Sequence, residues 1–137
     1  MNGNERSPVI LIAEDDPDER ASLRALLELK NLKVVEASSA QEGLKVIRES
    51  SPDLIILDIM METKNAGFDL AYQLRKDPEL RKIPIILLSN LPNIIGEVMN
   101  PEKEERYLPV ERFLTKPINP DLLFQEIERI LGVKLTG

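Results

Sequence analysis

Residues 54–58 read LIILD, a run of four apolar residues that ends on an aspartate. Similar runs occur at 9–13 (VILIA), which three acidic residues follow, and at 113–114 (FL), which comes just before Lys116. If the three runs are parallel strands of one sheet, their carboxyl ends meet in one crevice, where open α/β sheets bind their ligands. The sequence therefore predicts one site that combines three acids with one lysine.

The composition excludes several classes of function. The 137 residues fit one domain with an independent core. The net charge is -6 and there is no basic block, so direct nucleic-acid binding is not expected, because phosphate contacts need clustered Lys or Arg. Cysteine and histidine are absent, which excludes thiolate metal sites, cysteine nucleophiles and histidine bases. A phosphoryl group carried on histidine would have to come from another molecule.

The chain has no apolar segment of the length that a bilayer requires. Its start, MNGNERS, is polar, and no apolar run approaches the roughly 20 residues of a transmembrane helix. We therefore expect a soluble, cytoplasmic protein without membrane insertion. The expected organisation is a polar, disordered N-terminus at 1–7, one domain at 8–132 and a C-terminal tail at 133–137.

Short apolar runs alternate along the chain with segments of helical period. This alternation is typical of βαβ units around a parallel sheet. The runs are brief, as buried central strands often are. The five expected strands are Val9–Ala13, Lys33–Ala37, Leu54–Leu57, Ile85–Leu88 and Arg112–Leu114.

Helix start and stop signals lie between these strands. The first helix has Asp16 as N-cap, Pro17 at its first position and Glu19 three residues after the cap, and it should stop near Asn31. Further helices are expected from Ser39 to Ser51, from about Gly67 to Lys76, and from Asn119 to Gly132. Between Leu91 and Val110, prolines and a glycine interrupt the pattern, so a fourth helix there should be short or distorted.

The acidic residues carry the predicted chemistry. Glu14, Asp15 and Asp58 would lie close together, and each pair of like charges at ~4 Å costs roughly 1–4 kcal/mol. A bound cation would relieve this repulsion. Ligands that are all oxygen atoms suit Mg²⁺. Asp58 could then attack phosphorus as an ionised carboxylate, without a base. Mg²⁺ and Lys116 would neutralise the transferring group, and Ser89 offers a hydroxyl donor.

Together these residues resemble the receiver domain of two-component response regulators, from Val9 to Leu131. The similarity is specific because it is spread over four separate stretches. The stretches are similar to the family's acidic pair with its first helix, its phosphoacceptor strand, its switch-hydroxyl strand and its lysine-proline strand. In that order they are LIAEDDPDER (11–20), LIILDIMM (54–61), PIILLSN (84–90) and RFLTKPI (112–118).

The resemblance implies a fold and a metal site. The fold is a flavodoxin-like, doubly wound, five-stranded parallel sheet of order 2-1-3-4-5, with helices on both faces. Asp58 would be the phosphoacceptor. Asp15 and Asp58 would bind Mg²⁺ directly, the Met60 backbone carbonyl would be a third ligand, and Glu14 would act through water.

The resemblance also implies a switch. Ser89 would move towards the phosphoryl group, Phe113 would follow into the released space, and Lys116 would pair with the phosphate. A cis peptide bond is expected before Pro117, as the sequence permits.

The implied function is that of a stand-alone response regulator, a phosphoprotein of a two-component system or phosphorelay. It would take its phosphoryl group from a sensor histidine kinase or a histidine phosphotransfer protein, catalysing only its own phosphorylation and dephosphorylation. It is not expected to be a turnover enzyme. An unknown downstream protein would bind the surface of the fourth helix, fifth strand and fifth helix, whose two-state equilibrium the new charge would bias.

Several positions depart from the family's usual pattern. Glu62 stands where proline is common, Gly67 comes one residue late, and Asn90 replaces a small residue. The interval from Ser89 to Lys116 is about five residues longer than is typical, and a Gly-Ala pair before the fifth strand is absent. The catalytic residues can still be assigned despite these departures. The surface that would bind a downstream protein cannot be inferred from the resemblance.

The same residues argue against other classes of function. A flavin or nucleotide enzyme would need a Gly-, Ser- or Thr-rich loop after the first strand, whereas this loop is EDDPDE. A phosphohydrolase using Asp16 and Asp18 would leave Asp58 unexplained. The remaining alternative is a receiver-like interaction module that never accepts phosphate, against which the complete set of acids and lysine argues. Taken singly, Ser89 and Phe113 are common structural residues.

Overall fold

The structure is a computed structural model that describes residues 7–61, 63, 66–89 and 110–136. The fourth helix predicted between Leu91 and Val110 and the disordered start predicted at 1–7 fall almost entirely outside the described residues, and the unusual Glu62 and Asn90 also lie outside them. Among the helices that the structure describes, none is long and apolar enough to cross a membrane.

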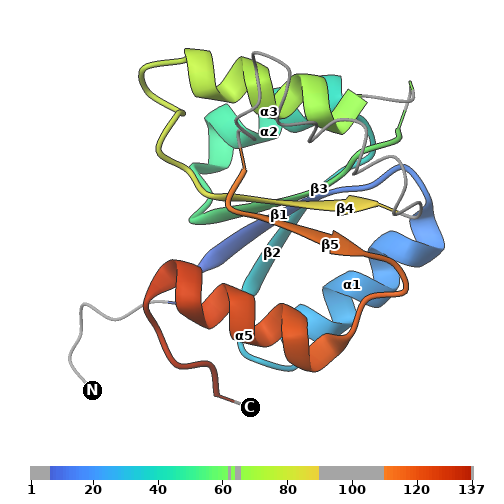
Figure 1. The fold of residues 1–137 in the computed structure, drawn as a ribbon, viewed down its shortest axis with the longest axis vertical. Coiled ribbons are helices and arrows are strands. Elements are labelled where there is room, and N and C mark those ends of the chain that lie inside the picture. Colours follow the sequence, from blue (N-terminus) through green and yellow to red (C-terminus); the bar gives the residue numbers. More distant parts are fainter. Residues whose placement is uncertain (1–6, 62, 64–65, 90–109, 137) are drawn as a thin grey trace, which may run out of the picture.

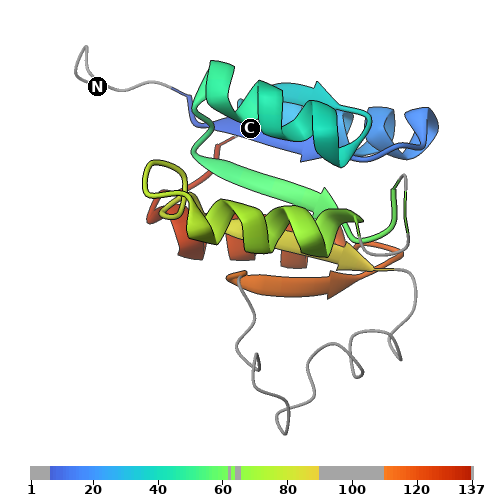
Figure 2. The ribbon, with the colours of Figure 1, turned by 90° about the horizontal axis from the view of Figure 1, so that it is seen from above.

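A five-stranded parallel sheet forms the centre of the molecule, in the order β2-β1-β3-β4-β5. The predicted strands and the predicted flavodoxin-like order are confirmed, with the last three strands each one residue longer at the carboxyl end. All strands point the same way, so their carboxyl ends share one edge (Figure 2). The strands are β1 (Val9–Ala13), β2 (Lys33–Ala37), β3 (Leu54–Asp58), β4 (Ile85–Ser89) and β5 (Arg112–Thr115).

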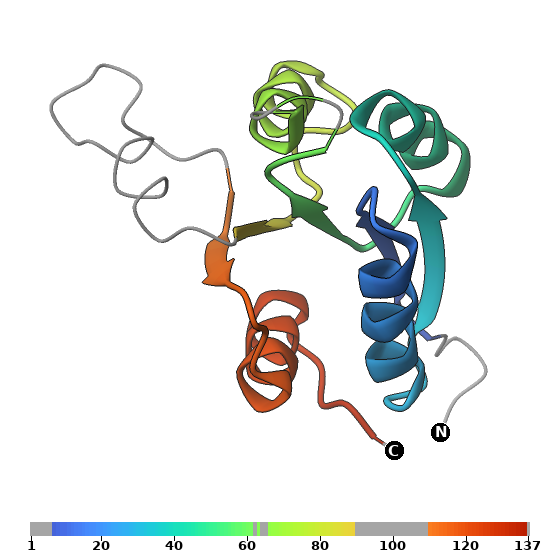
Figure 3. The same ribbon diagram turned by 90° about the vertical axis from the view of Figure 1, so that its right-hand side faces the viewer.

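Helices cover both faces of the sheet (Figures 1 and 3). One layer contains α2 (Ala40–Ser50) and α3 (Ala66–Lys76), and the other contains α1 (Pro17–Glu28) and α5 (Pro120–Leu131). Each layer encloses its own apolar core, because successive strand side chains point to opposite faces. The predicted helices that fall within the described residues are thus confirmed to within a few residues at each end.

Local sequence signals set the helix ends. Asp16, Ser39 and Asn119 cap α1, α2 and α5 by accepting hydrogen bonds from backbone N–H groups of the first turn. Gly132 ends α5 in the left-handed conformation, with φ at 68°. α1 ends at Glu28, slightly before the predicted stop.

The C-terminal residues 133–136 pack back on the domain. Leu135 contributes to the core under α1 and α5, and its N–H donates to Glu128 Oε2 at 2.8 Å. Asn31 Nδ2 donates to Thr136 Oγ1 at 3.2 Å. The short tail is therefore held against the end of α1 and the end of α5.

Candidate functional site

Lys116 gathers three carboxylates at the carboxyl end of the sheet. Its Nζ donates to Glu14 Oε1 at 2.9 Å, to Asp58 Oδ2 at 2.9 Å and to Glu19 Oε1 at 2.5 Å. An ammonium group has three N–H donors, so these bonds use all of them. We call these four residues the lysine cluster. Its members come from the ends of β1, β3 and β5 and from the first turn of α1.

Two of these carboxylates are buried, and the cluster holds more acid than base. Glu14 is 3% exposed and Asp58 5% exposed. Burial, with the neighbouring Asp58, raises the pKa of Glu14 to about 8, although Lys116 opposes the rise. Burial would lower the pKa of Lys116, but its hydrogen bonds to Glu19, Asp58 and Glu14 outweigh burial and raise it. Lys116 therefore stays charged. With a single ammonium beside them, the three carboxylates would repel one another if all were ionised.

The start of α1 positions Glu14. The N–H of Glu14 donates to the Ala37 carbonyl of β2 at 3.1 Å, and the carbonyl of Glu14 accepts from Arg20 Nη1 at 2.8 Å. Its second carboxylate oxygen accepts from the N–H of Asp16 at 3.1 Å. Both the backbone and the side chain of Glu14 are therefore held where β1 turns into α1.

Close contact with the backbone at Gly67 fixes the position of Asp58. A Cβ atom at Gly67 would lie 2.0 Å from the Asp58 carbonyl oxygen, so only glycine fits there. The N–H of Gly67 donates to the Ile59 carbonyl at 2.9 Å, and the N–H of Met60 donates to Asp58 Oδ1 at 3.3 Å. The glycine that comes one residue late in the sequence thus lets α3 begin directly on the backbone that carries Asp58.

The structure brings only some of the predicted site residues into the lysine cluster. Among the described residues, the acids with oxygens close enough to share a cation are Glu14, Glu19 and Asp58. Asp15 is exposed and is not in that group. Met60 is exposed beside Asp58. The predicted metal ligands Glu14 and Asp58 are therefore adjacent, whereas the predicted ligands Asp15 and Met60 are exposed and lie outside the lysine cluster.

Glu19 belongs to the cluster although the sequence did not indicate it. Its position three residues after the N-cap predicts a side chain that returns to the backbone N–H of Asp16. Instead that N–H bonds to Glu14, and the Glu19 carboxylate reaches Lys116. The only sequence signal was an acidic residue in a helical turn that directly follows the acidic strand end.

The predicted switch residues lie on β4 and β5. Ser89 is buried at the end of β4, and its carbonyl accepts from the N–H of Lys116 at 2.8 Å. Phe113 is half-buried and packs against the core beneath α2 and α3. The peptide bond between Lys116 and Pro117 is cis.

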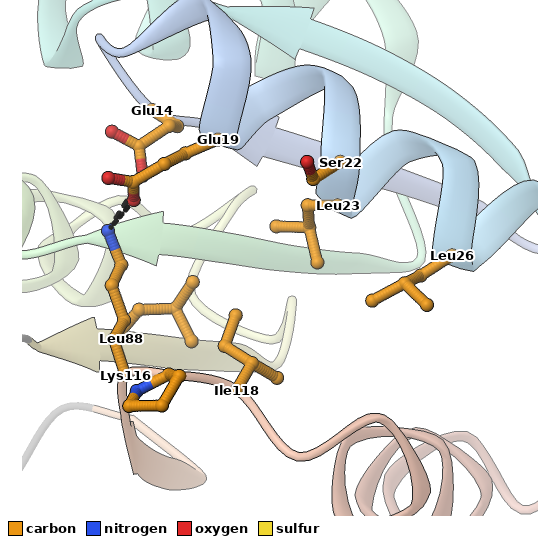
Figure 4. A pocket seen from close by; sticks show the side chains of 9 residues that line it. Glu14, Glu19, Ser22, Leu23, Leu26, Leu88, Lys116 and Ile118 are labelled. Carbon is orange, nitrogen blue, oxygen red and sulfur yellow. Dashed lines mark hydrogen bonds and ion pairs between the residues drawn. The ribbon is translucent and has the colours of Figure 1, made fainter.

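A groove of about 490 Å³ opens from the lysine cluster along α1. Glu14, Glu19 and Lys116 lie at one end of it and Leu26 at the other (Figure 4). Its middle is mainly apolar. The remaining lining residues are Ser22, Leu23, Leu88, Pro117 and Ile118.

The sequence pattern of the response regulator receiver domain family matches residues 10–128. The chain belongs to this family. Protein PilH of Pseudomonas aeruginosa is 32% identical over 123 residues, which cover 90% of this chain and 97% of PilH. AfsQ1, a transcriptional regulatory protein of Streptomyces coelicolor, is 32% identical over 124 residues, but the chain spans only about half (51%) of its length.

Solved structures have the same fold. A putative response regulator from Chloroflexus aurantiacus matches 93% of this chain and 99% of its own, with a TM-score of 0.80 and 24% identity. At that identity the match supports the fold alone. The response regulator TrrA of Thermotoga maritima, solved in complex with Mg²⁺-BeF, matches 90% of this chain and 99% of its own, with a TM-score of 0.75 and 25% identity.

The family membership assigns the chain to a general class. Receiver domains of two-component signalling are phosphoacceptors rather than turnover enzymes, and they work with histidine kinases. The acidic pocket around Asp58 is typical of such a domain. The donor set also fits a hard divalent cation, since it consists of carboxylates with an excess of negative charge.

Proposed function

We propose that this receiver accepts a phosphoryl group on Asp58 from a phosphohistidine of a sensor histidine kinase or histidine phosphotransfer protein. In this step the P–N bond of the donor breaks, a P–O bond to the Asp58 carboxylate forms, and the imidazole keeps the electron pair. The observation that carries the proposal is the contact of a buried Asp58 with the Lys116 ammonium. A carboxylate so placed needs no base, and the ammonium can neutralise phosphoryl oxygens.

Mg²⁺ is the proposed cofactor, and it would supply positive charge against the phosphoryl oxygens. Asp58, Asp15 and the Met60 carbonyl are its proposed ligands, with Glu14 acting through water. The excess of acid over base in the lysine cluster supports this assignment, because Glu14 is held with a raised pKa until positive charge is added. The proposed receiver unit is residues 8–132.

The proposed output is a change in partner binding. Ser89 would move towards the phosphoryl group and Phe113 would follow, which would alter the surface of β5 and α5. This idea is supported by the hydrogen bond from the backbone N–H of Lys116 to the Ser89 carbonyl, because a shift of the Lys116 backbone would also move the end of β4. The fourth-helix part of the predicted surface lies at 90–109, outside the described residues.

Labelling of an Asp58→Asn variant tests the proposal. The protein is incubated with phosphoramidate and Mg²⁺, and intact mass spectrometry measures the gain of one phosphoryl group. We expect labelling of the parent, removal of the label by hydroxylamine as befits an acyl phosphate, and no label on Asp58→Asn. Asp121→Asn is the matched control, because it removes an exposed aspartate elsewhere.

A label that persists in Asp58→Asn would show that another residue is the nucleophile. If the parent stays unlabelled under donor excess, the chain is instead a receiver-like interaction module that does not accept phosphate.

A further inference from the structure

Glu19 is the least constrained partner of Lys116. Its side chain is 46% exposed, whereas those of Glu14 and Asp58 are 4% and 7% exposed. It reaches the ammonium from the first turn of α1, while the other two carboxylates stand at strand ends. Glu14 has a second bond, from the N–H of Asp16 to its other carboxylate oxygen.

A phosphoryl group on Asp58 would need one of the three N–H donors that Glu14, Glu19 and Asp58 now occupy. Lys116 has no fourth N–H to offer, so a phosphoryl oxygen can bond to it only if one present acceptor leaves. Asp58 would itself carry the phosphoryl group, and Glu14 is held from two sides. Glu19 is the acceptor that water can most readily solvate, because its carboxylate is the most exposed of the three.

The groove beside the lysine cluster gives the displaced side chain a place to go. Glu19, Ser22 and Lys116 all line it, so the Glu19 carboxylate can turn away from the ammonium without entering the packed core. Figure 4 shows Glu19 at one end of this groove, with Ser22, Leu23 and Leu26 following along α1. A rotation of the Glu19 side chain would release the ammonium.

We infer that Glu19 is a placeholder that occupies Lys116 in the unphosphorylated protein and competes with the phosphoryl group for it. The Glu19 carboxylate holds one N–H of the ammonium, and its negative charge lowers the affinity of the site for an incoming anion. The inference rests on the proposed function, since it concerns the same lysine. It makes Glu19 a positioning residue that sets how readily the site accepts a phosphoryl group.

The test compares Glu19→Gln with Asp18→Asn in binding of beryllofluoride, a non-covalent phosphoryl mimic, with Mg²⁺. Both substitutions remove one negative charge from the first turn of α1, but only Glu19 contacts Lys116. Titration calorimetry should give about two- to fivefold tighter binding for Glu19→Gln than for Asp18→Asn, which is the range of a partly exposed ion pair. The difference should shrink at high salt.

The possible outcomes separate this inference from the proposed function. If the parent binds beryllofluoride but Glu19→Gln binds no more tightly than Asp18→Asn, the placeholder role is wrong. Weaker binding by Glu19→Gln would mean that Glu19 preorganises Lys116 instead of competing for it, which also overturns the inference. If the parent neither binds beryllofluoride nor accepts a label on Asp58, the proposed function and the inference fail together. Urea denaturation of each variant verifies that it is folded.

Discussion

Two clusters of charged residues include side chains of α1. One cluster has more carboxylates than basic groups, and the other has more basic groups than carboxylates. In the lysine cluster, three carboxylates share one ammonium. In the second, which we call the arginine cluster, Arg20 and Arg24 of α1 share the single carboxylate of Glu36 on β2. Arg20 connects the two, because its Nη1 also donates to the carbonyl of Glu14.

The two clusters shift the pKa of a glutamate in opposite directions. Glu14 is buried with too little positive charge, and its pKa rises to about 8. Burial would also raise the pKa of Glu36, but hydrogen bonds from Arg24 and Arg20 outweigh burial and lower it. The contrast indicates that the arginine cluster is complete as it stands and supports the fold. The lysine cluster keeps more acid than base, as expected of a functional site that would bind a cation.

Among the substitutions that test this contrast, loss of Lys116 should change the free energy of unfolding most. Lys116→Met leaves Glu14 and Asp58 buried without a base, so we expect the free energy of unfolding to fall by about 3–5 kcal/mol without divalent ions. Mg²⁺ should restore more stability to the variant than it adds to the parent. Urea denaturation with and without Mg²⁺ measures both effects. Lys45→Met, at an exposed site on α2, is the control, and equal losses in the two variants would contradict the role of the lysine cluster.

The effect of pH on the free energy of unfolding should be smaller than the effect of Lys116→Met. The pKa of Glu14 is raised from 4.5 to about 8 by folding, so the folded state keeps a proton that the unfolded state has released between these values. Its contribution is fully present below about pH 4.5 and is lost as the pH rises through about 8. We expect the metal-free protein to lose about 2–3 kcal/mol over this window, within a ceiling of roughly 1.4 kcal/mol per pH unit.

Urea denaturation across this pH window, with Glu14→Gln as the reference, isolates that group. The amide does not titrate, so the loss should disappear in the variant. A profile of Glu14→Gln that follows the parent would assign the titration to some other residue.

Disruption of the arginine cluster should have the smallest effect. Glu36→Gln leaves two arginines with a weaker partner at a partly exposed position, so we expect a loss of about 1 kcal/mol that Mg²⁺ does not change. Glu28→Gln, which affects the exposed Arg24–Glu28 pair alone, should change stability by less than about 0.5 kcal/mol. Chemical denaturation measures both. A several-fold change in Mg²⁺ affinity in Glu36→Gln would reveal that Arg20 couples the two clusters.

The central strands β1, β3 and β4 could be predicted from sequence because each is a short apolar run bounded by turn or cap residues. Burial on both faces makes such runs continuous rather than alternating, and β3 and β4 are buried at every position. The polar residues that end β1 and β3, and Lys116 just after β5, were predicted to converge for the same reason. Parallel strands in one sheet leave their carboxyl ends little freedom to lie anywhere else.

The partner of Glu19 could not be predicted in this way. A glutamate three residues after an N-cap forms the same local pattern whether it bonds to its own backbone or to a distant lysine. The choice depends on how the first turn of α1 lies over the end of β5, which joins residues 97 positions apart. The need for glycine at position 67 is similar, because it comes from contact with the Asp58 backbone and not from a turn conformation.

The sequence by itself determined the α/β class, the strand positions and the gathering of acids with one lysine, because apolar periodicity and strand-end chemistry are local properties. Tertiary structure alone decided which carboxylates share the ammonium, how deeply each is buried and therefore which acid has the raised pKa. Those properties depend on distances of a few ångströms between residues far apart in the chain, and no local pattern encodes them.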